Sequence, residues 1–448
     1  MLVELPPQLH VRYANGHLEV QGDTTRRMSI SAQAMLQDLL ACVDERAVDF
    51  ICIASGAYAI DRFHRRRSDI KNEAGIRTIS VCFHVADPHY WSQTWVVDQL
   101  AEILNFLSGD LWLISFEYHK RLAPEFRQEI FDFRSSWRPE RVALYSGGLD
   151  SAAGLACALM DGHRDLLLLT AGHQSAIRRR ALDQVSALKH LLPGAGSICH
   201  ASFVLGLESA GRIRDQETTQ RSRGFLFCAS GAVLAAACGV ETIHIYENGH
   251  GAINLPLIGG GISHGFSTRG AHPAFLDMMT LLASDVLGRT VGFELPYIGA
   301  TKANMLARLS PNSGLADWSQ NSRSCVHTSW RELGITHCGY CPACIERHQA
   351  IEGSGVVDRT TYSKPLWERA NALDDDYFRS YVWQAQRWAS RDLGIIERLV
   401  DHCALSRLPA PTEDLILLHQ QHAAEVLSVY ARHADAPSGP TPPLLKVA

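Results

Sequence analysis

Hydrophobic and polar positions follow a regular two-part rhythm between residues 141 and 249. Short apolar runs alternate with longer segments in which apolar residues recur at helical spacing. We expect strands in residues 141–147, 165–172, 197–205 and 241–249, and helices in residues 151–160, 176–192 and 223–239. Apolar strands that alternate with helices are typical of a parallel sheet covered by helices on both faces. The pattern therefore predicts an α/β fold for this part of the chain.

The residues before this part predict a mixed α+β unit. An alternating segment interrupted by Asn15-Gly16 indicates a β-hairpin over residues 10–21, because an Asn-Gly step suits a tight turn. Helical spacing predicts helices in residues 31–47 and 91–109, the second ending at Gly109. Three β-rich segments predict strands, in residues 48–56, 76–87 and 110–119. No catalytic cluster stands out here, so we assign this unit no chemistry.

After the α/β part, the chain becomes glycine-rich and then helical. Residues 254–270 are rich in glycine and serine and predict a functional loop or lid. Helical patterns return in residues 366–394 and 414–434. A length of 448 residues suits two or three domains. We expect an N-terminal α+β domain in residues 1–135 and a central α/β domain in residues 136–352. A helical extension should follow in residues 353–433, and a disordered tail in residues 434–448.

Charge and hydropathy exclude several classes of partner. The net charge is -5, with 42 basic and 47 acidic residues, so nothing favours tight binding to a nucleic-acid backbone. No apolar run approaches the ~18 residues of a membrane span. The first residues lack the basic and apolar regions of a secretory signal. We therefore expect a cytoplasmic protein without a membrane or nucleic-acid partner.

A glycine loop, SGGLDS in residues 146–151, joins the first strand and helix of the α/β part. Its two adjacent glycines allow a ligand to approach the main chain, and the following helix directs its free N–H groups and positive dipole end toward that ligand. The loop lacks the Lys-Ser/Thr pair of a P-loop and the third glycine of a dinucleotide fingerprint. It therefore predicts an anion site of another kind.

Four of the 12 cysteines form a cluster, whereas the other eight are dispersed along the chain. The cluster consists of Cys325, Cys338, Cys341 and Cys344. Two x₂ spacings and a fourth thiolate from a preceding segment suit a tetrahedral, structural Zn²⁺ site with no open position for catalysis. A [4Fe–4S] cluster also takes four cysteines. A histidine can also replace one cysteine, the candidates being His327, His337 and His348.

The loop and the cysteines together resemble a known family. The SGGLDS string is similar to the SGGxDS pyrophosphate loop of the PP-loop ATP pyrophosphatases, and the cysteine spacing that follows it resembles the 7-cyano-7-deazaguanine synthases, the QueC family. The resemblance covers residues 141–352. Residues 221–226, RSRGFL, are similar to that family's Arg-Asn-x-x-Phe-Leu segment, and residues 296–303, with Lys302, to its Pro-Leu…Asn-Lys-Ala segment.

The resemblance implies a PP-loop fold and an ATP-dependent ligase that forms a C–N bond, with Mg²⁺ and structural Zn²⁺ as further cofactors. Members of the family adenylate 7-carboxy-7-deazaguanine, add ammonia to give the amide and dehydrate it to the nitrile. Residues implied to hold the pyrophosphate and its metal are Ser146, Gly147, Gly148, Leu149, Asp150 and Ser151. Those implied in catalysis are Asp150, Ser151, Arg221 and Lys302, the last two neutralising phosphate charge.

The chain also departs from this family. Residues 247–256, ENGHGAINLP, replace the Gly-Tyr-Pro-Asp-Cys-Arg stretch that receives the deazapurine. The two flanking regions resemble extended QueC-like proteins of bacterial anti-phage islands (the Qat and type IV CBASS systems). This implies a defence role, with ammonia or a protein amine as acceptor and other defence proteins as partners. The alternatives are a PP-loop tRNA thiolase and a catalytically silent nucleotide-binding scaffold.

Overall fold

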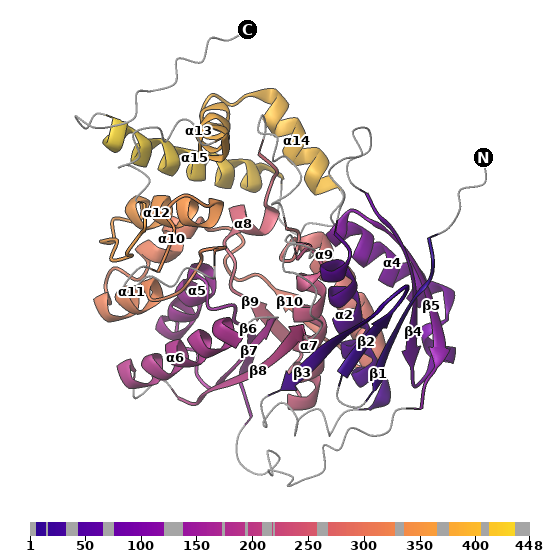
Figure 1. Ribbon diagram of the computed structural model, residues 1–448. Coiled ribbons are helices and arrows are strands. Elements are labelled where there is room, and N and C mark those ends of the chain that lie inside the picture. The colour runs from indigo at the N-terminus through magenta and orange to yellow at the C-terminus, as the bar shows by residue number, and fades with distance from the viewer. Residues whose placement is uncertain are drawn as a thin grey trace.

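The computed structural model describes most of the chain, with gaps between the stretches that it places. The described residues are 6–14, 17–32, 44–65, 76–120, 138–172, 175–192, 196–207, 217, 220–257, 268–327, 336–364, 376–404 and 412–434. Within them, one mixed sheet carries helices on both faces (Figure 1).

Ten strands of the described residues form this sheet, in the order β10-β9-β6-β7-β8-β3-β2-β1-β4-β5. The strands are β1 Leu9–Ala14, β2 His17–Gln21, β3 Thr25–Ala32, β4 Thr78–Val85, β5 Leu111–Tyr118, β6 Arg141–Leu144, β7 Leu166–Gly172, β8 Ile198–Leu207, β9 Thr242–Ile245 and β10 Gly292–Glu294. The helices are α2 Glu45–Phe63, α3 Pro88–Trp91, α4 Thr94–Ser108, α5 Leu149–Met160, α6 Ser175–Leu191, α7 Arg223–Cys238, α8 Gly249–Ile253, α9 Pro273–Leu287, α10 Lys302–Ala307, α11 Ser313–Gln320, α12 Pro342–Gly353, α13 Asp376–Ala389, α14 Leu393–Ala404 and α15 Thr412–Ala434.

The strands predicted for the α/β part form a parallel group. β10, β9, β6, β7 and β8 are neighbours and all run parallel. Their side chains alternate between two cores: Val142 and Leu144 face the core that contains α7 and α9, whereas Ala143 faces the core that contains α5, α6, α10 and α11. The expectation of an α/β fold with a parallel sheet and helices is confirmed here, and this arrangement is compatible with a PP-loop fold.

The N-terminal strands extend the same sheet. β3 pairs antiparallel with β8, β2 with β3 and β1 with β2, after which β4 and β5 continue in parallel pairing. The predicted pairing of the hairpin strands is confirmed, although the Asn15-Gly16 turn itself lies outside the described residues. The domain boundaries remain predictions, and the sheet is continuous from β3 to β8.

Residues 48–56 are helical, so the predicted strand there is wrong. They lie in α2, which Asp44 caps by accepting a hydrogen bond from the Ala47 amide. This helix is buried on nearly all sides, between the N-terminal strands and helices α7 and α9. A fully buried helix has no polar face, so its pattern does not differ from that of a buried strand. Gly56 permits the packing, because a Cβ there would lie 2.6 Å from the side chain of Val11.

Of the other elements predicted in the N-terminal part, some are confirmed and one is partly wrong. The predicted strands in residues 76–87 and 110–119 are β4 and β5, and the second predicted helix is α4, which ends at Gly109 with φ 71°. The predicted helix in residues 31–47 is wrong at its start, because β3 extends to Ala32. Its last three residues are helical, but they are the beginning of α2, which starts at Glu45 and continues to Phe63. Residues 33–43 lie outside the described residues, as do most of the predicted lid and nearly all of the predicted tail.

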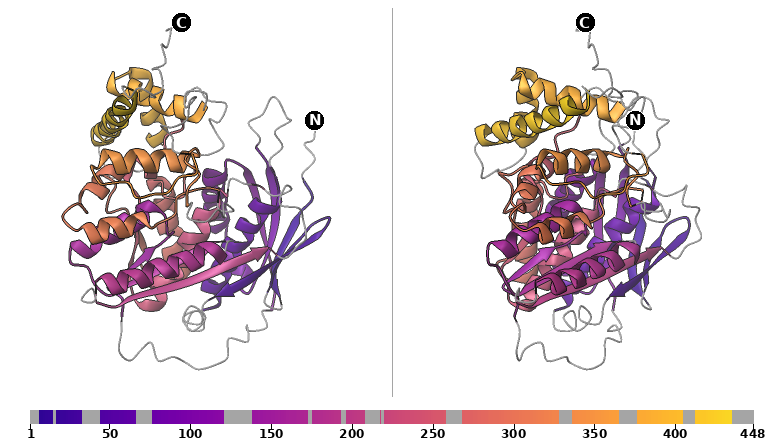
Figure 2. Two further views of the ribbon diagram at one scale, coloured as in Figure 1. Left: turned by 60° about the vertical axis from the view of Figure 1, so that its left-hand side comes forward. Right: turned by 90° about the vertical axis from the view of Figure 1, so that its left-hand side faces the viewer.

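The C-terminal helices form a third layer. α15 packs on α8 and α12, α13 packs on α12 and α15, and α14 packs on α13 and α15, so that these helices stack at the top of Figures 1 and 2. Their own core includes Phe378, Trp388 and Leu418, and it reaches Ile253 of α8 and Ile345 of α12. Among the described helices, none combines the length and the apolar character that crossing a membrane requires.

Candidate functional site

The glycine loop forms a compact turn between β6 and α5. Gly147 adopts φ 72°, a conformation that favours glycine. The Ser146 hydroxyl accepts a hydrogen bond from the Gly148 amide at 3.2 Å and lies 3.1 Å from the hydroxyl of Ser151. Ser151 in turn donates to the Gly148 carbonyl at 3.0 Å. The two serines therefore stabilise the loop from within, at the carboxyl end of β6.

Asp150 lies at the centre of a group that we call the polar centre: Asp150, Glu247, Asn248, Lys302 and Glu346. The Lys302 ammonium lies 3.1 Å from one carboxylate oxygen of Asp150 and 3.5 Å from Glu346. The Asn248 amide donates to the other Asp150 oxygen at 2.9 Å and to Glu247 at 2.8 Å. Four elements thus meet here: the start of α5, the segment between β9 and α8, the start of α10, and α12.

The polar centre has more negative than positive groups. Three carboxylates surround a single ammonium in a largely buried position. Burial first, and then the charge of Asp150, raises the pKa of Glu247 well above its usual value. Burial alone would lower the pKa of Lys302, but the charges of Asp150 and Glu346 raise it above its usual value. An excess of carboxylate oxygens suits a hard divalent cation such as Mg²⁺.

The raised pKa of Glu247 leads to a first prediction. The unfolded carboxyl ionises near its ordinary value of 4.5, whereas the folded one holds its proton to higher pH. Without Mg²⁺, the unfolding free energy should therefore fall as pH rises above that value, by up to about 1.4 kcal/mol per pH unit until the folded group ionises. Glu247→Gln should remove this fall, so the variant should gain relative stability with increasing pH in urea titrations.

The matched control for this prediction is Glu241→Gln, because Glu241 is exposed just before β9. This variant should follow the pH dependence of the wild type. A constant difference in stability between Glu247→Gln and the wild type from acid to neutral pH would contradict the assigned pKa shift.

The segment after β9 is held in place by tight packing. Asn248 caps α8 by accepting from the Gly251 amide at 2.9 Å, while its own amide donates to Asp150. At Gly249, a Cβ would lie 1.8 Å from the carbonyl oxygen of Ile298 and 2.6 Å from Leu418 of α15. Only glycine fits this position, so the C-terminal helices and the polar centre are packed as one unit.

A pair of stacked histidines links α8 to α15. The ring of His250 stacks on His422 of α15, with centroids 3.6 Å apart and an angle of 23°. Burial, followed by the charge of Lys302, lowers the pKa of His250 to about 3, and burial also lowers the pKa of His422. The Tyr377 hydroxyl of α13 donates to Glu346 at 2.8 Å. The C-terminal helices therefore bring neutral aromatic groups to the border of the polar centre.

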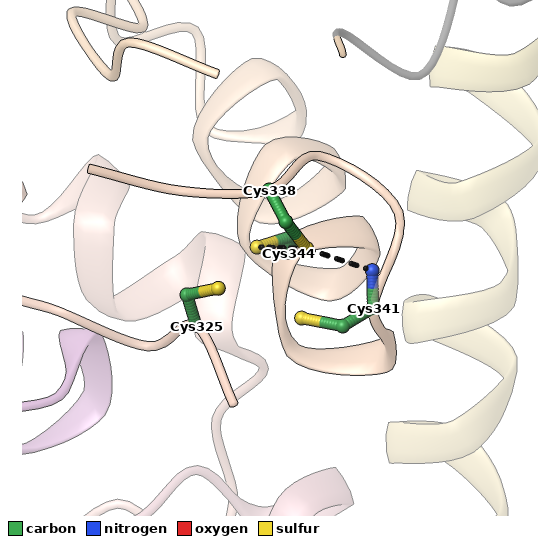
Figure 3. A group of neighbouring side chains, drawn as sticks. All are labelled: Cys325, Cys338, Cys341 and Cys344. Carbon is green, nitrogen blue, oxygen red and sulfur yellow. Dashed lines mark hydrogen bonds between the residues drawn. The ribbon is translucent and has the colours of Figure 1, made fainter. Parts of the chain in front are cut away.

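The four predicted cysteines converge (Figure 3). Their sulfur atoms all lie within 4.8 Å of one another, and those of Cys338 and Cys344 are 3.8 Å apart. Thiolates about 2.3 Å from one tetrahedral ion lie roughly 3.8 Å from each other. The Cys341 amide donates to the sulfur of Cys338. Hydrogen bonds from neighbouring thiols, first that of Cys338, lower the pKa of Cys325. This donor set fits a single Zn²⁺ ion.

Two of the alternative ligands have partners outside the cluster: His337 Nε2 accepts from the Ser324 amide at 3.3 Å, and His348 pairs with Asp358 at 3.1 Å. His327 Nδ1 lies 3.4 Å from the sulfur of Cys338, at the border of the cluster. The group with the spacing of one ligand set is that of the four cysteines. Their close spacing also favours one ion over a four-iron cluster, whose irons hold the thiolates further apart.

The cysteine cluster is linked directly to the glycine loop. The amide of Arg323 donates to the Gly147 carbonyl at 2.9 Å, and the Leu149 amide donates to the Ser324 hydroxyl at 3.3 Å. Arg347 is fully buried and donates to Ser322 at 3.1 Å, which ties α12 to the same segment. A metal at the cysteines would therefore fix the segment on which the glycine loop rests.

Arg221 contacts the N-terminal unit. Its guanidinium donates to the Ser108 carbonyl at the end of α4 at 2.8 Å, and the neighbouring Ser222 donates to Asp61 of α2. These contacts therefore dock this segment on the N-terminal unit, and the role of Arg221 in catalysis stays a prediction. The structure does bring together the loop, Asp150 and Lys302.

Several residues of the site had no signal in the sequence. Glu346 becomes visible only because α12 packs beside α10, and Tyr377 and His422 lie in a helical pattern that indicates only a helical extension. Glu247, Asn248 and His250 fall in the segment that departs from the resembled family, so that departure is the one clue to them.

Taken together, a parallel α/β sheet, a strand–glycine loop–helix unit and an adjoining Cys₄ cluster define a class of protein compatible with the PP-loop fold. No family model matches the chain. Curated relatives include three 7-cyano-7-deazaguanine synthases. That of Sinorhizobium fredii is 30% identical over 104 residues, which are 22% of this chain and 40% of that protein. That of Methylobacillus flagellatus is 27% identical over 237 residues, 50% of this chain and 95% of that protein.

The third, from Brucella anthropi, is 29% identical over 154 residues, 34% of this chain and 55% of that protein. The matches span about 40% of the length of the first relative and nearly all of the second. The chain is therefore similar to 7-cyano-7-deazaguanine synthases, over up to half of its length.

Proposed function

We propose that the chain adenylates a 7-deazaguanine carboxylate at the expense of ATP and then forms an amide. The observation that carries this proposal is the position of Asp150, at the end of the glycine loop and between Lys302 and Asn248. This arrangement places a carboxylate and an ammonium beside a loop suited to a pyrophosphate. The relatedness to 7-cyano-7-deazaguanine synthases supports the substrate class.

The proposed reaction has two steps. A carboxylate oxygen of the deazaguanine acid attacks the α-phosphorus of ATP, and the bond to the bridging oxygen breaks to release pyrophosphate. An amine nitrogen then attacks the acyl carbon, loses a proton and expels AMP. The amine is ammonia or the amine of a protein, and with ammonia the amide can lose water to give the nitrile.

The chain's own groups have distinct roles in this proposal. Gly147, Gly148 and the start of α5 receive the pyrophosphate with main-chain N–H groups, because a helix N-terminus favours negative charge. Lys302 offsets phosphate charge and orients Asp150. Asp150 and Glu247 are the carboxylates that would hold Mg²⁺, which neutralises charge on the leaving group when bound. Donors preplaced for developing charge contribute most to such a step.

The segment from Glu247 to Ile253 and the C-terminal helices would recognise the acid and its acceptor. The stacked pair of His250 and His422 offers flat, neutral rings beside the polar centre. In this proposal the C-terminal helices, which pack on α8 and α12, provide a docking surface for a protein acceptor, and the activity serves in anti-phage defence.

Mass spectrometry of the products tests the proposed function. The full chain is incubated with ATP, Mg²⁺ and 7-carboxy-7-deazaguanine, with and without ammonium and the proteins encoded beside it. We expect the deazaguanine acid to become an amide, a nitrile or a protein adduct only when ATP is present. Consumption of ATP without any deazaguanine product would contradict the substrate class.

A further inference from the structure

The outer face of the N-terminal strands carries a second cluster of metal-ligating side chains, formed by His10, Cys82, His84 and Glu117. It lies within the sheet and far along the chain from the four clustered cysteines. Three neighbouring strands contribute: β1 supplies His10, β4 supplies Cys82 and His84, and β5 supplies Glu117.

The sheet register explains this convergence. His10 is the pairing partner of Cys82, and His84 is the partner of Glu117, so the four side chains form two adjacent rows. The intervening residue Phe83 points to the opposite face, where it packs in the main core with α2 and α4. Because successive side chains of a strand alternate between faces, all four donors must lie on the face away from that core.

The donor atoms already have the spacing of one coordination sphere. His10 Nδ1 lies 3.2 Å from His84 Nε2, and His84 Nε2 lies 3.9 Å from the Glu117 carboxylate. All four ligand atoms, including the sulfur of Cys82, lie within 4.8 Å of one another. Two nitrogens held about 2.05 Å from a tetrahedral ion are roughly 3.3 Å apart. The observed nitrogen separation therefore matches one edge of such a tetrahedron.

We propose that His10, Cys82, His84 and Glu117 bind a second divalent ion of the zinc class. Two imidazoles, one thiolate and one carboxylate form a mixed set that zinc accepts and that Mg²⁺ does not favour. Cys82 is only 1% exposed and closes the inner side of the site, whereas the Glu117 side chain is 58% exposed and leaves a path from solvent. The bound ion would tie β1, β4 and β5 together at one end of the sheet.

Zinc counting on the full chain tests this proposal. The wild type, His84→Ala and His10→Ala are each equilibrated with excess Zn²⁺, freed of loosely held ion by gel filtration and analysed for zinc per chain. His89→Ala is the matched control, because His89 is an exposed histidine of the same N-terminal unit. We expect both ligand variants to hold one zinc fewer than the wild type, and the control to hold the same number.

Zinc bound at the Cys₄ cluster does not affect the test, because only the difference in zinc content between a variant and the wild type is used. Thermal unfolding curves check that each of the three variants is folded. If His84→Ala does not fold, the result for His10→Ala decides. A zinc count equal to that of the wild type in the folded ligand variants would overturn the proposal.

Discussion

Asp150→Asn should reduce the formation of AMP by at least about 100-fold, since a single preplaced polar group can contribute that much to the stabilisation of developing charge. Asp150 connects three parts of the site, because it begins α5 and contacts both Lys302 and Asn248. Its replacement by an amide of the same shape removes the charge that pairs with Lys302 and that, in the proposed function, would help to hold Mg²⁺. Initial rates of AMP release measure the effect.

Asp161→Asn is the control for this change. Asp161 follows the same helix, lies near the surface and pairs with Arg308 at 2.7 Å, away from the glycine loop. It should leave the rate within a few-fold of the wild type. A rate within tenfold of the wild type for a folded Asp150→Asn variant would contradict the site.

Cys338→Ser should remove one zinc per chain and lower the free energy of unfolding by several kcal/mol. Cys338 is fully buried, and its sulfur lies 3.8 Å from that of Cys344. Structural zinc sites contribute their binding free energy to folding, so the loss of one ligand lowers both the affinity for zinc and the free energy of unfolding. Because Arg323 and Ser324 hold the glycine loop, AMP formation should fall as well.

Zinc content, the urea unfolding midpoint and the rate of AMP release measure these effects. Cys238→Ser, at the end of α7 and outside the cluster, is the matched control and should keep the wild-type zinc content. If Cys338→Ser kept the metal and the unfolding midpoint of the wild type, the cysteines would not form a structural site. Iron in place of zinc would support the cluster alternative.

Local sequence patterns predicted much of the secondary structure. The alternation of apolar runs and helices predicted β6 to β9 and α5 to α7, because each of these elements has its own period and its own end signals. The cysteine spacing predicted convergence of four sulfurs for a similar reason, since the x₂ steps act within one turn. The prediction for residues 48–56 was wrong, because burial on nearly all sides removed the exposed polar face that identifies a helix.

Contacts between distant segments could not be predicted in the same way. The pairing of β3 with β8 joins residues about 175 positions apart, and nothing in either strand specifies its neighbour. Likewise, Glu346, Tyr377 and His422 reach the polar centre only through the packing of α12, α13 and α15. The candidate loop and the lysine were predictable from motifs, whereas the groups that surround them depended on the tertiary structure.

The central claim is the cleavage of ATP between its α and β phosphates, coupled to a deazaguanine carboxylate. It is tested most directly by quantifying nucleotide and phosphate products from ATP in the presence and absence of 7-carboxy-7-deazaguanine. We predict AMP and pyrophosphate in equal amounts over several turnovers, and only when the acid is present. ADP with orthophosphate, or AMP formation that does not depend on the acid, would contradict the account.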